Sequence, residues 1–292
     1  MKKIGAAIGT FDGLHLGHRS VLEKLKKVSK EREMQPVAIT FDRHPLELIS
    51  PERVPPQLTT IGKRKKLLRE TGVEPLVLSF DEELRKTSAE EWMHRMNKEL
   101  GVGLLVIGYD NTFGHDGVNL SVSDYKEIGK KHGIEVIAAE ELKDISSSAI
   151  RKAVNNGDME KACEMLGRPY SITSEVKSGQ SIGRALGFPT ANMAIDEKIA
   201  IPKNGAYASI VRLPDGTKHP AMVNIGVRPT LGRGNQRVIE VHILNWEGDL
   251  YGKEITVRFL KRLRDEKKFN SIDELKRQLI KDREEVFGVV KL

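Results

Sequence analysis

The stretch that decides the fold is Gly9-Thr10-Phe11-Asp12-Gly13-Leu14-His15-Leu16-Gly17-His18, which follows an apolar run and opens a segment with helical periodicity. A strand, a glycine-containing turn and a helix together gather backbone N–H groups and the positive end of the helix dipole at one point, where an anion binds. Gly13 and Gly17 leave room there for a phosphate to approach the backbone. His15 and His18 are spaced to fall on one helical face and to donate hydrogen bonds to phosphate oxygens. The setting favours a phosphate-binding loop over an ordinary turn followed by solvent-exposed histidines.

Outward from this loop, the chain as far as residue 167 alternates short β-rich runs with helical patterns. Continuous apolar strands separated by helices are typical of a parallel sheet covered on both faces, so we predict a Rossmann-like α/β domain. It contains neither a Walker A sequence nor the G-x-G-x-x-G fingerprint, so phosphates must be held in another way. Strands are predicted at residues 4–8, 37–41, 76–78, 104–107 and 136–139, and helices at 21–28, 88–100, 122–132 and from about Ala149.

Beyond Tyr170 the pattern changes to short strands separated by turns. A short antiparallel β-barrel closed by one C-terminal helix fits this half, and the boundary between the halves is predicted at Gly167-Arg168-Pro169. The strands are predicted at residues 206–213, 221–225, 238–244 and 255–260, with turns at 214–216 and 247–249 and a helix whose apolar positions are Ile272, Leu275, Leu279 and Val286.

Composition excludes several classes of protein. The 292 residues carry 48 Lys and Arg against 41 Asp and Glu, a net charge of +7 with an isoelectric point near 9.3. The surplus is dispersed, since the basic run Lys63-Arg64-Lys65-Lys66 has Glu70 four residues beyond its end, and aromatic residues make up only 5%, so nucleic-acid binding is not expected. The single Cys163 excludes an internal disulfide and a cysteine-based zinc site. With no signal peptide and no apolar run near ~18 residues, we expect a cytoplasmic protein without membrane association.

Three further segments of the first half carry candidate binding residues. Thr40-Phe41-Asp42-Arg43-His44-Pro45 and the segment 108–114 each follow a predicted strand, and ligands of open α/β sheets bind at such ends. Ser146-Ser147-Ser148-Ala149-Ile150-Arg151 opens a helix, where hydroxyl and N–H groups could meet a phosphate and Arg151 would add charge. Taken alone, the first of these is equally consistent with a strand-terminating turn, and the last with simple helix capping.

Two segments of the second half are informative. Residues 179–187 are rich in glycine and lead directly into Phe188-Pro189-Thr190-Ala191-Asn192, which suggests a flap beside neutral oxygen ligands for a nucleotide-bound Mg²⁺. In the strand 238–244, Ile239, Val241 and Ile243 form one apolar face, so Glu240 and His242 share the other. Glu240 either faces solvent or serves as a general base, and the spacing alone does not decide between them.

In chain order, these segments resemble the family of bacterial bifunctional riboflavin kinases and FMN adenylyltransferases, also called FAD synthetases. The family's G-x-F-D-G-x-H-x-G-H, T-F-D-x-H-P and S-S-[ST]-x-[IV]-R stand at residues 9–18, 40–45 and 146–151. The resemblance covers nearly the whole chain, and G-F-P-T-A-N joined to N-I-G-x-R-P-T is its most specific part. G-R-x-L-G-F-P-T-A-N, N-I-G-x-R-P-T, E-x-H-I-L and G-D-L-Y-G stand at 183–192, 224–230, 240–244 and 248–252.

The resemblance implies two ATP-dependent reactions, with residues 1–167 as a nucleotidyltransferase domain and 168–292 as a kinase domain. The barrel would phosphorylate the riboflavin 5′-hydroxyl to give FMN, with Glu240 as base and Thr190 and Asn192 binding Mg²⁺. The first domain would join FMN to AMP and release pyrophosphate, giving FAD, with His15 and His18 stabilising the in-line transition state. The further residues implied in binding nucleotide, phosphates or flavin are Gly9, Phe11, Asp12, Asp110, Ser147, Ser148, Arg151, Gly179, Gly183 and Arg184.

The segment after Asp110 departs from the family pattern. Asn111 replaces a common aromatic residue, and His115-Asp116-Gly117 is shorter and less basic than usual. A riboflavin kinase that has lost efficient adenylyl transfer is therefore one alternative. A flavin- or RNA-binding regulator without enzymatic activity is a second, with little support from the composition. Whether the chain forms a homo-oligomer is left open.

Overall fold

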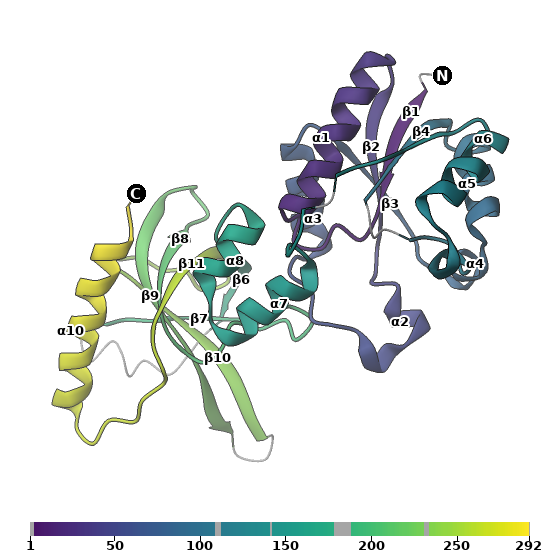
Figure 1. Ribbon diagram of the computed structural model, residues 1–292. Coiled ribbons are helices and arrows are strands. Elements are labelled where there is room, and N and C mark those ends of the chain that lie inside the picture. The colour runs from purple at the N-terminus through teal and green to yellow at the C-terminus, as the bar shows by residue number, and fades with distance from the viewer. Residues whose placement is uncertain (1–2, 109–111, 141, 178–187, 231–233, 292) are drawn as a thin grey trace. The chain divides into compact units, whose positions relative to one another are not determined.

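The computed structural model describes residues 3–108, 112–140, 142–177, 188–230 and 234–291 (Figure 1). Its contacts divide the chain into two compact units, Met1–Ser147 and Ser148–Leu292. This division by packing falls before Gly167, because helix α8 (Met159–Leu166) packs on the barrel strands of the second unit. The predicted boundary between the two activities, at residue 167, stays a prediction.

The first unit is built on a five-stranded parallel sheet, as predicted. The strand order is β3-β2-β1-β4-β5, so the chain moves outward from β1 in one direction and then returns to place β4 on its other side. Ligands of such sheets bind at the carboxyl ends of the strands where the order reverses, which here are the ends of β1 and β4. The strands are β1 (Ile4–Ile8), β2 (Gln35–Phe41), β3 (Glu74–Leu78), β4 (Val102–Ile107) and β5 (Glu135–Ala138).

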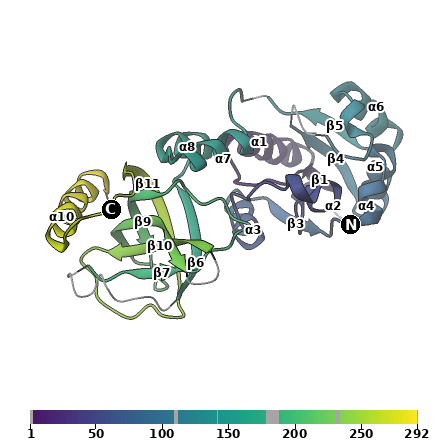
Figure 2. The same cartoon turned by 90° about the horizontal axis from the view of Figure 1, so that it is seen from below.

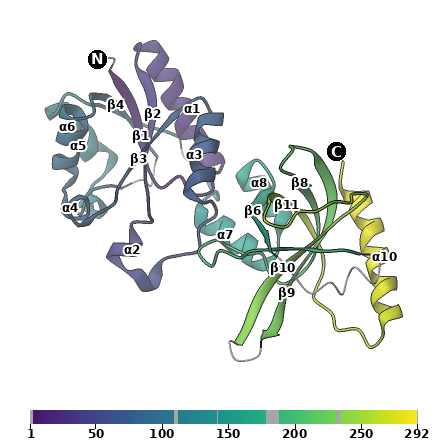
Figure 3. The ribbon, with the colours of Figure 1, turned by 180° about the vertical axis from the view of Figure 1, so that it is seen from behind.

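Helices cover both faces of this sheet. Figure 3 shows α1 and α3 on one face and α4, α5 and α6 on the other. Helix α3, which contains the basic run 63–66, was not among the predicted helices. The helices of this unit are α1 (Leu16–Glu31), α2 (Leu46–Ile49), α3 (Ile61–Glu70), α4 (Glu82–Lys86), α5 (Ala89–Lys98) and α6 (Val122–Lys131), with 3-10 turns at Pro51–Arg53 and Gly117–Asn119.

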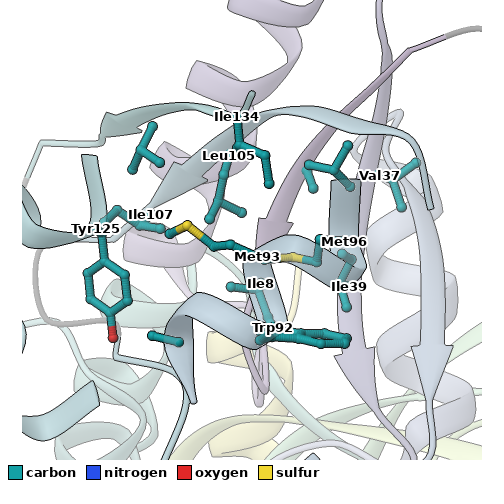
Figure 4. Close-up of a cluster of buried hydrophobic side chains, with 14 of the residues drawn as sticks. Ile8, Val37, Ile39, Trp92, Met93, Met96, Leu105, Ile107, Tyr125 and Ile134 are labelled. Carbon is teal, nitrogen blue, oxygen red and sulfur yellow. The ribbon is translucent and has the colours of Figure 1, made fainter. Parts of the chain in front are cut away.

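The strand alternation divides the apolar core of the first unit into two clusters. Ala7 faces α1 and α3, whereas Ile8 faces the opposite cluster, where α5 inserts Trp92, Met93 and Met96 (Figure 4). Because successive side chains of a strand point to opposite faces, a strand buried on both sides reads as one continuous apolar run. The predicted covering of both faces is therefore confirmed.

The second unit is a closed antiparallel barrel with strand order β10-β7-β6-β11-β8-β9, which confirms the predicted architecture. Helix α7 (Ser147–Asn156) precedes α8 and begins at Ser147, earlier than predicted. Strands β6 and β7 were not among those predicted. The strands are β6 (Tyr170–Lys177), β7 (Ala191–Met193), β8 (Gly205–Arg212), β9 (Lys218–Thr230), β10 (Gly234–Ile243) and β11 (Glu254–Arg264).

The predicted C-terminal helix is α10 (Ile272–Val289), which lies along the outside of the barrel against β8, β9 and β11 (Figure 2). Its Val286 is fully buried in a cluster with Ala208 and Met222 of the barrel. None of the helices in the described ranges has the length and apolar content needed to cross a bilayer.

An ion pair fixes α10 to the end of β11. The Asp282 carboxylate, only 3% exposed, accepts hydrogen bonds from Arg264 Nε at 3.1 and 3.0 Å and from Arg264 Nη2 at 2.7 Å. Gln278 Nε2 donates to the same carboxylate at 2.8 Å. The buried charge is thus both paired and hydrogen-bonded, the condition under which such a pair is tolerated.

We expect Asp282→Ala to lower the free energy of unfolding of the barrel by roughly 3 kcal/mol, because it leaves the Arg264 guanidinium without its partner. Thermal and urea unfolding of the full chain, followed by circular dichroism, measure the effect. Glu284→Gln, which changes an exposed carboxylate on the same helix, is the matched control and should stay within about 0.5 kcal/mol of the wild type. Equal stability of the two variants would contradict this role.

Candidate active sites

The loop after β1 is held by one buried carboxylate. Asp12 is 1% exposed, and its two oxygens accept hydrogen bonds from Leu58 N at 3.0 and 2.9 Å and from Thr59 N and Thr59 Oγ1 at 3.0 Å. The Thr59 hydroxyl in turn accepts a hydrogen bond from Gly13 N at 3.1 Å. Asp12 and Thr59 therefore clamp the loop onto the turn that precedes α3. The resemblance implied nucleotide contact for Asp12, which stays a prediction beside this structural role.

This clamp holds a strained backbone. Phe11 and Leu14 have φ of 47° and 40°, in the left-handed region that L-residues rarely adopt, and Gly13 between them has φ of 79°. Both non-glycine side chains are buried, at 2% and 0% exposure, so packing and the clamp together maintain the conformation. Such backbone strain clusters at active sites and ligand-binding loops.

His15 and His18 lie together at the start of α1, as their spacing indicates. The two rings stack with centroids 3.7 Å apart. The Phe11 and His18 rings pack in a T-shaped arrangement, with centroids 5.4 Å apart. His15 caps the helix, since its Nδ1 accepts a hydrogen bond from His18 N at 3.3 Å. A neutral His15 therefore carries its proton on Nε2, where it can donate to an anion. A side chain at Gly17 would press on the His15 ring, because its Cβ would lie 3.1 Å from Nδ1.

Two other predicted segments reach this loop. Ser147 Oγ donates to the carbonyl oxygen of Asp12 at 3.0 Å, so the serine segment begins beside the loop. Thr40, fully buried at the end of β2, donates its hydroxyl proton to the carbonyl oxygen of Thr10 at 3.2 Å. Ser148 and Arg151 belong to the second unit, and Asp110 lies outside the described residues.

Asp42 in the T-F-D-x-H-P segment has a structural task. Its oxygens accept from Phe80 N and from Ser79 Oγ, both at 3.0 Å, which ties the end of β2 to the end of β3. Burial alone would raise the pKa of Asp42, but these hydrogen bonds outweigh it and hold the pKa below the ordinary value.

We expect Thr59→Val to destabilise the first unit by about 1–3 kcal/mol, because it leaves Gly13 N–H and one Asp12 oxygen short of a partner in a buried setting. Thr59→Ser, which keeps the hydroxyl, is the control and should recover most of the loss. In a Trp246→Phe background, the fluorescence of the remaining tryptophan, Trp92, reports urea unfolding of the first unit alone. A Val variant as stable as the wild type would remove the clamp from the explanation of this loop.

The barrel carries a row of three polar side chains across neighbouring strands. Glu240 of β10 is paired with Asn192 of β7 on one side and with Asn224 of β9 on the other. Residues paired across strands point to the same face, so these three groups lie side by side. Ile239 and Val241, which flank Glu240 on β10, are buried at 0% and 1% exposure, while Glu240 is half-buried. The predicted division of this strand, with Ile239 and Val241 on one face and Glu240 on the other, is therefore observed.

His242, the next residue on the Glu240 face, supports the adjoining segment. Its Nδ1 donates to the carbonyl oxygen of Pro189 at 2.7 Å. Its ring packs against that of Phe188 in a T-shaped arrangement, with centroids 5.2 Å apart. Burial lowers the pKa of His242, although the hydrogen bond to Pro189 acts in the opposite direction, so the ring is neutral at pH 7. His242 thereby fixes the backbone immediately before Thr190, a half-buried residue.

Oxygen donors suited to Mg²⁺ adjoin Glu240. Thr190 and Asn192 offer neutral oxygens, and Mg²⁺ commonly takes one or two protein ligands and completes its shell with water and substrate phosphates. Among the described residues, no group of three or more His, Cys, Asp or Glu is placed to hold a metal ion. The predicted flap residues Gly179, Gly183 and Arg184 lie outside the described residues.

Two residues of these sites were not singled out from the sequence. Asn224 opens the N-I-G-x-R-P-T motif, but its place beside Glu240 follows only from strand register. Arg64 stood inside a basic run and is 5% exposed in the structure. The signal that was available is its helical spacing from Leu67 and Leu68, which places it on the buried stripe of α3.

The first unit is a parallel α/β sheet with a histidine pair on the loop after its first strand, and the second is a closed barrel with a carboxylate between two amides. These features fit a two-domain nucleotide-dependent transferase. Residues 1–152 match the family model of FAD synthetase, and residues 166–289 match that of riboflavin kinase. The chain therefore belongs to the family of bifunctional riboflavin kinases and FMN adenylyltransferases. The predicted pair of activities is confirmed with it.

The chain is similar along nearly its whole length to curated members of that family. It is 35% identical to the bifunctional riboflavin kinase/FMN adenylyltransferase of Buchnera aphidicola subsp. Schizaphis graminum, over 97% of this chain and 94% of the relative. Identity to the Escherichia coli K12 protein of the same name is 34%, over 97% and 93%. For that of Bacillus subtilis 168 it is 34%, over 96% and 90%.

Among solved structures, the chain is similar to a crystal structure described as a macrolide-efflux protein from Streptococcus pneumoniae. The TM-score is 0.87 at 29% identity, over 98% of this chain and 95% of the other. This likeness confirms the predicted two-part fold, while the activities follow from the two family models and the curated relatives.

Proposed function

We propose that phosphorylation of riboflavin takes place at the Glu240 row of the barrel and adenylylation of FMN at the loop between Gly9 and His18. The observation that carries the first assignment is the pairing of Glu240 with an amide on either side. The stacked, capped histidine pair on a strained loop carries the second. Residues 168–292 and 1–167 are the corresponding catalytic domains.

In the kinase reaction, the riboflavin 5′-hydroxyl attacks the γ-phosphorus of ATP, and Glu240 accepts the hydroxyl proton as the new O–P bond forms and ADP leaves. Thr190 and Asn192 would hold Mg²⁺, which would offset negative charge on the phosphates. His242 keeps the Pro189–Thr190 backbone in place through its hydrogen bond. Gly179, Gly183 and Arg184, which lie outside the described residues, are assigned by this proposal to nucleotide binding.

In the adenylyltransferase reaction, a phosphate oxygen of FMN attacks the α-phosphorus of ATP, and pyrophosphate leaves on the opposite side. His15 Nε2–H and His18 donate hydrogen bonds to phosphate oxygens as negative charge shifts, so the loop acts by positioning and electrostatics. No covalent enzyme intermediate is needed. The residues that contact nucleotide or flavin are Gly9, Phe11, Asp12, Asp110, Ser147, Ser148 and Arg151.

Three wider inferences accompany these assignments. The positive balance of +7 helps to draw ATP and FMN toward their sites and does not require a nucleic-acid partner. A cytoplasmic location fits a flavin-converting enzyme whose described helices do not span a bilayer. Size-exclusion chromatography with light scattering decides whether the chain is a monomer or a homo-oligomer.

We expect Glu240→Gln to reduce FMN formation from riboflavin by about 100-fold or more, because an amide cannot accept the hydroxyl proton. Adenylylation of supplied FMN should stay within about twofold of the wild type. Separation of flavin products by chromatography measures both reactions in one sample. Glu254→Gln, at an exposed barrel position on β11, is the matched control. A Gln variant with normal FMN formation would rule out the proposed base.

The double variant His15→Ala, His18→Ala should show the opposite pattern. Loss of two donors to the reacting phosphates is expected to reduce FAD formation from supplied FMN by about 100-fold or more, while riboflavin phosphorylation continues. His94→Ala, which truncates a histidine elsewhere in the first unit, serves as control. If the folded double variant lost both activities, the assignment of two separate sites would be wrong.

A further inference from the structure

Arg64 is a buried cation in the middle of a basic run. Its residue exposure is 5%, whereas Lys66 of the same run is exposed and Lys63 and Lys65 are half-buried. Arginine is almost never buried to this extent unless it is paired. The burial of Arg64 therefore needs a physical explanation of its own, because the other basic residues of the run are not buried.

The partners of Arg64 are neutral oxygens. Nη1 donates to Thr40 Oγ1 and to the carbonyl oxygen of Phe41, both at 3.4 Å, and Nη2 donates to Gln57 Oε1 at 3.1 Å. Its Nε is buried and has no hydrogen-bond acceptor, and within the described part of the chain the guanidinium makes no ion pair. Burying a charge against neutral groups alone is unfavourable, so a purely apolar side chain would serve packing better.

The position of the guanidinium connects it to the adenylyl-transfer loop. Thr40 accepts a hydrogen bond from Arg64, and its hydroxyl donates a hydrogen bond to Thr10 O at the start of that loop. Gln57 immediately precedes the two residues that Asp12 binds. Arg64 thus supports both the loop and the turn to which the loop is clamped.

Charge gives a second connection. Asp12 is the anion that acts on Arg64 through space, and it raises the pKa of the guanidinium against the larger lowering effect of burial. A buried carboxylate within a phosphate-binding loop disfavours the approach of ATP unless its charge is offset, since Coulomb interactions are stronger away from water. Arg64 is the buried positive charge placed to offset Asp12.

We propose that Arg64 is a positioning residue for adenylyl transfer, which offsets the charge of Asp12 in the loop and, through Thr40 and Gln57, holds the loop in its phosphate-binding conformation. The proposal rests on the assignment of adenylyl transfer to the loop between Gly9 and His18. It gives Arg64 no contact with the substrates and no role in the barrel.

Two substitutions of Arg64 separate charge from shape. Arg64→Gln keeps a polar side chain without charge, and Arg64→Lys keeps the charge and N–H donors for the neutral oxygens of Thr40 and Gln57, without the planar fork. We expect Arg64→Gln to raise the KM for ATP in adenylyl transfer at least tenfold, with a smaller change in kcat. Arg64→Lys should lie within about threefold of the wild type. Riboflavin phosphorylation by the same samples should not change, and Lys66→Gln is the matched control from the exposed part of the run.

The results also distinguish a structural role and a failed site assignment. Folding of the first unit is followed by Trp92 fluorescence in a Trp246→Phe background, and the comparison of kinetic constants uses the folded fraction. If Arg64→Lys is as impaired as Arg64→Gln, or if both have a normal KM for ATP, the positioning role is overturned. If instead the double variant of His15 and His18 makes FAD normally, the loop assignment fails, whatever the Arg64 variants show. Should Arg64→Gln not fold, a tenfold or greater KM change in Arg64→Lys also counts against the proposal.

Discussion

The hydrogen bonds that Asp12 accepts from residues 58 and 59 are the interaction on which the first site depends. A chain that follows β1 directly into α1 must turn sharply, and this one does so with Phe11 and Leu14 in the left-handed region. Strain of this kind persists only where the surroundings over-determine it. The buried carboxylate, the Thr59 hydroxyl and the packing of both side chains supply that constraint. His15 can then serve as the cap of α1.

The barrel achieves its site by a different physical means. The register of three antiparallel strands places Glu240 between Asn192 and Asn224. A shift of one residue in β10 would move Glu240 to the apolar interior, so the burial of Ile239, Val241 and Ile243 secures the register and the site together. His242 extends this arrangement to the segment that contains Thr190.

Features that depend on local pattern were predictable, and features that depend on register or long-range packing were not. The β1–loop–α1 unit, the alternation around Glu240 and the pairing of His15 with His18 follow from spacing within a few residues. The clamp between Asp12 and Thr59 joins segments far apart in the chain, and the type of neither residue indicates which residue it contacts. Asn224 required the pairing of β9 with β10. Arg64 was not distinguished from the neighbouring lysines in the sequence, because charge alone does not indicate which member of a basic run lies on the buried side of a helix.

The place of β11 in the barrel has a consequence for synthesis of the protein. This strand pairs with β6 on one side and β8 on the other, so the barrel closes only after residues 254–264 have emerged from the ribosome. The sheet of the first unit uses no residue beyond β5 and can form much earlier, since domains generally fold as units in order of synthesis. Until β11 arrives, β6 and β8 each present an unpaired strand edge, the kind of surface that invites aggregation. The nascent chain is therefore most vulnerable in the interval between the synthesis of β6 and that of β11, after the first unit has already had time to fold.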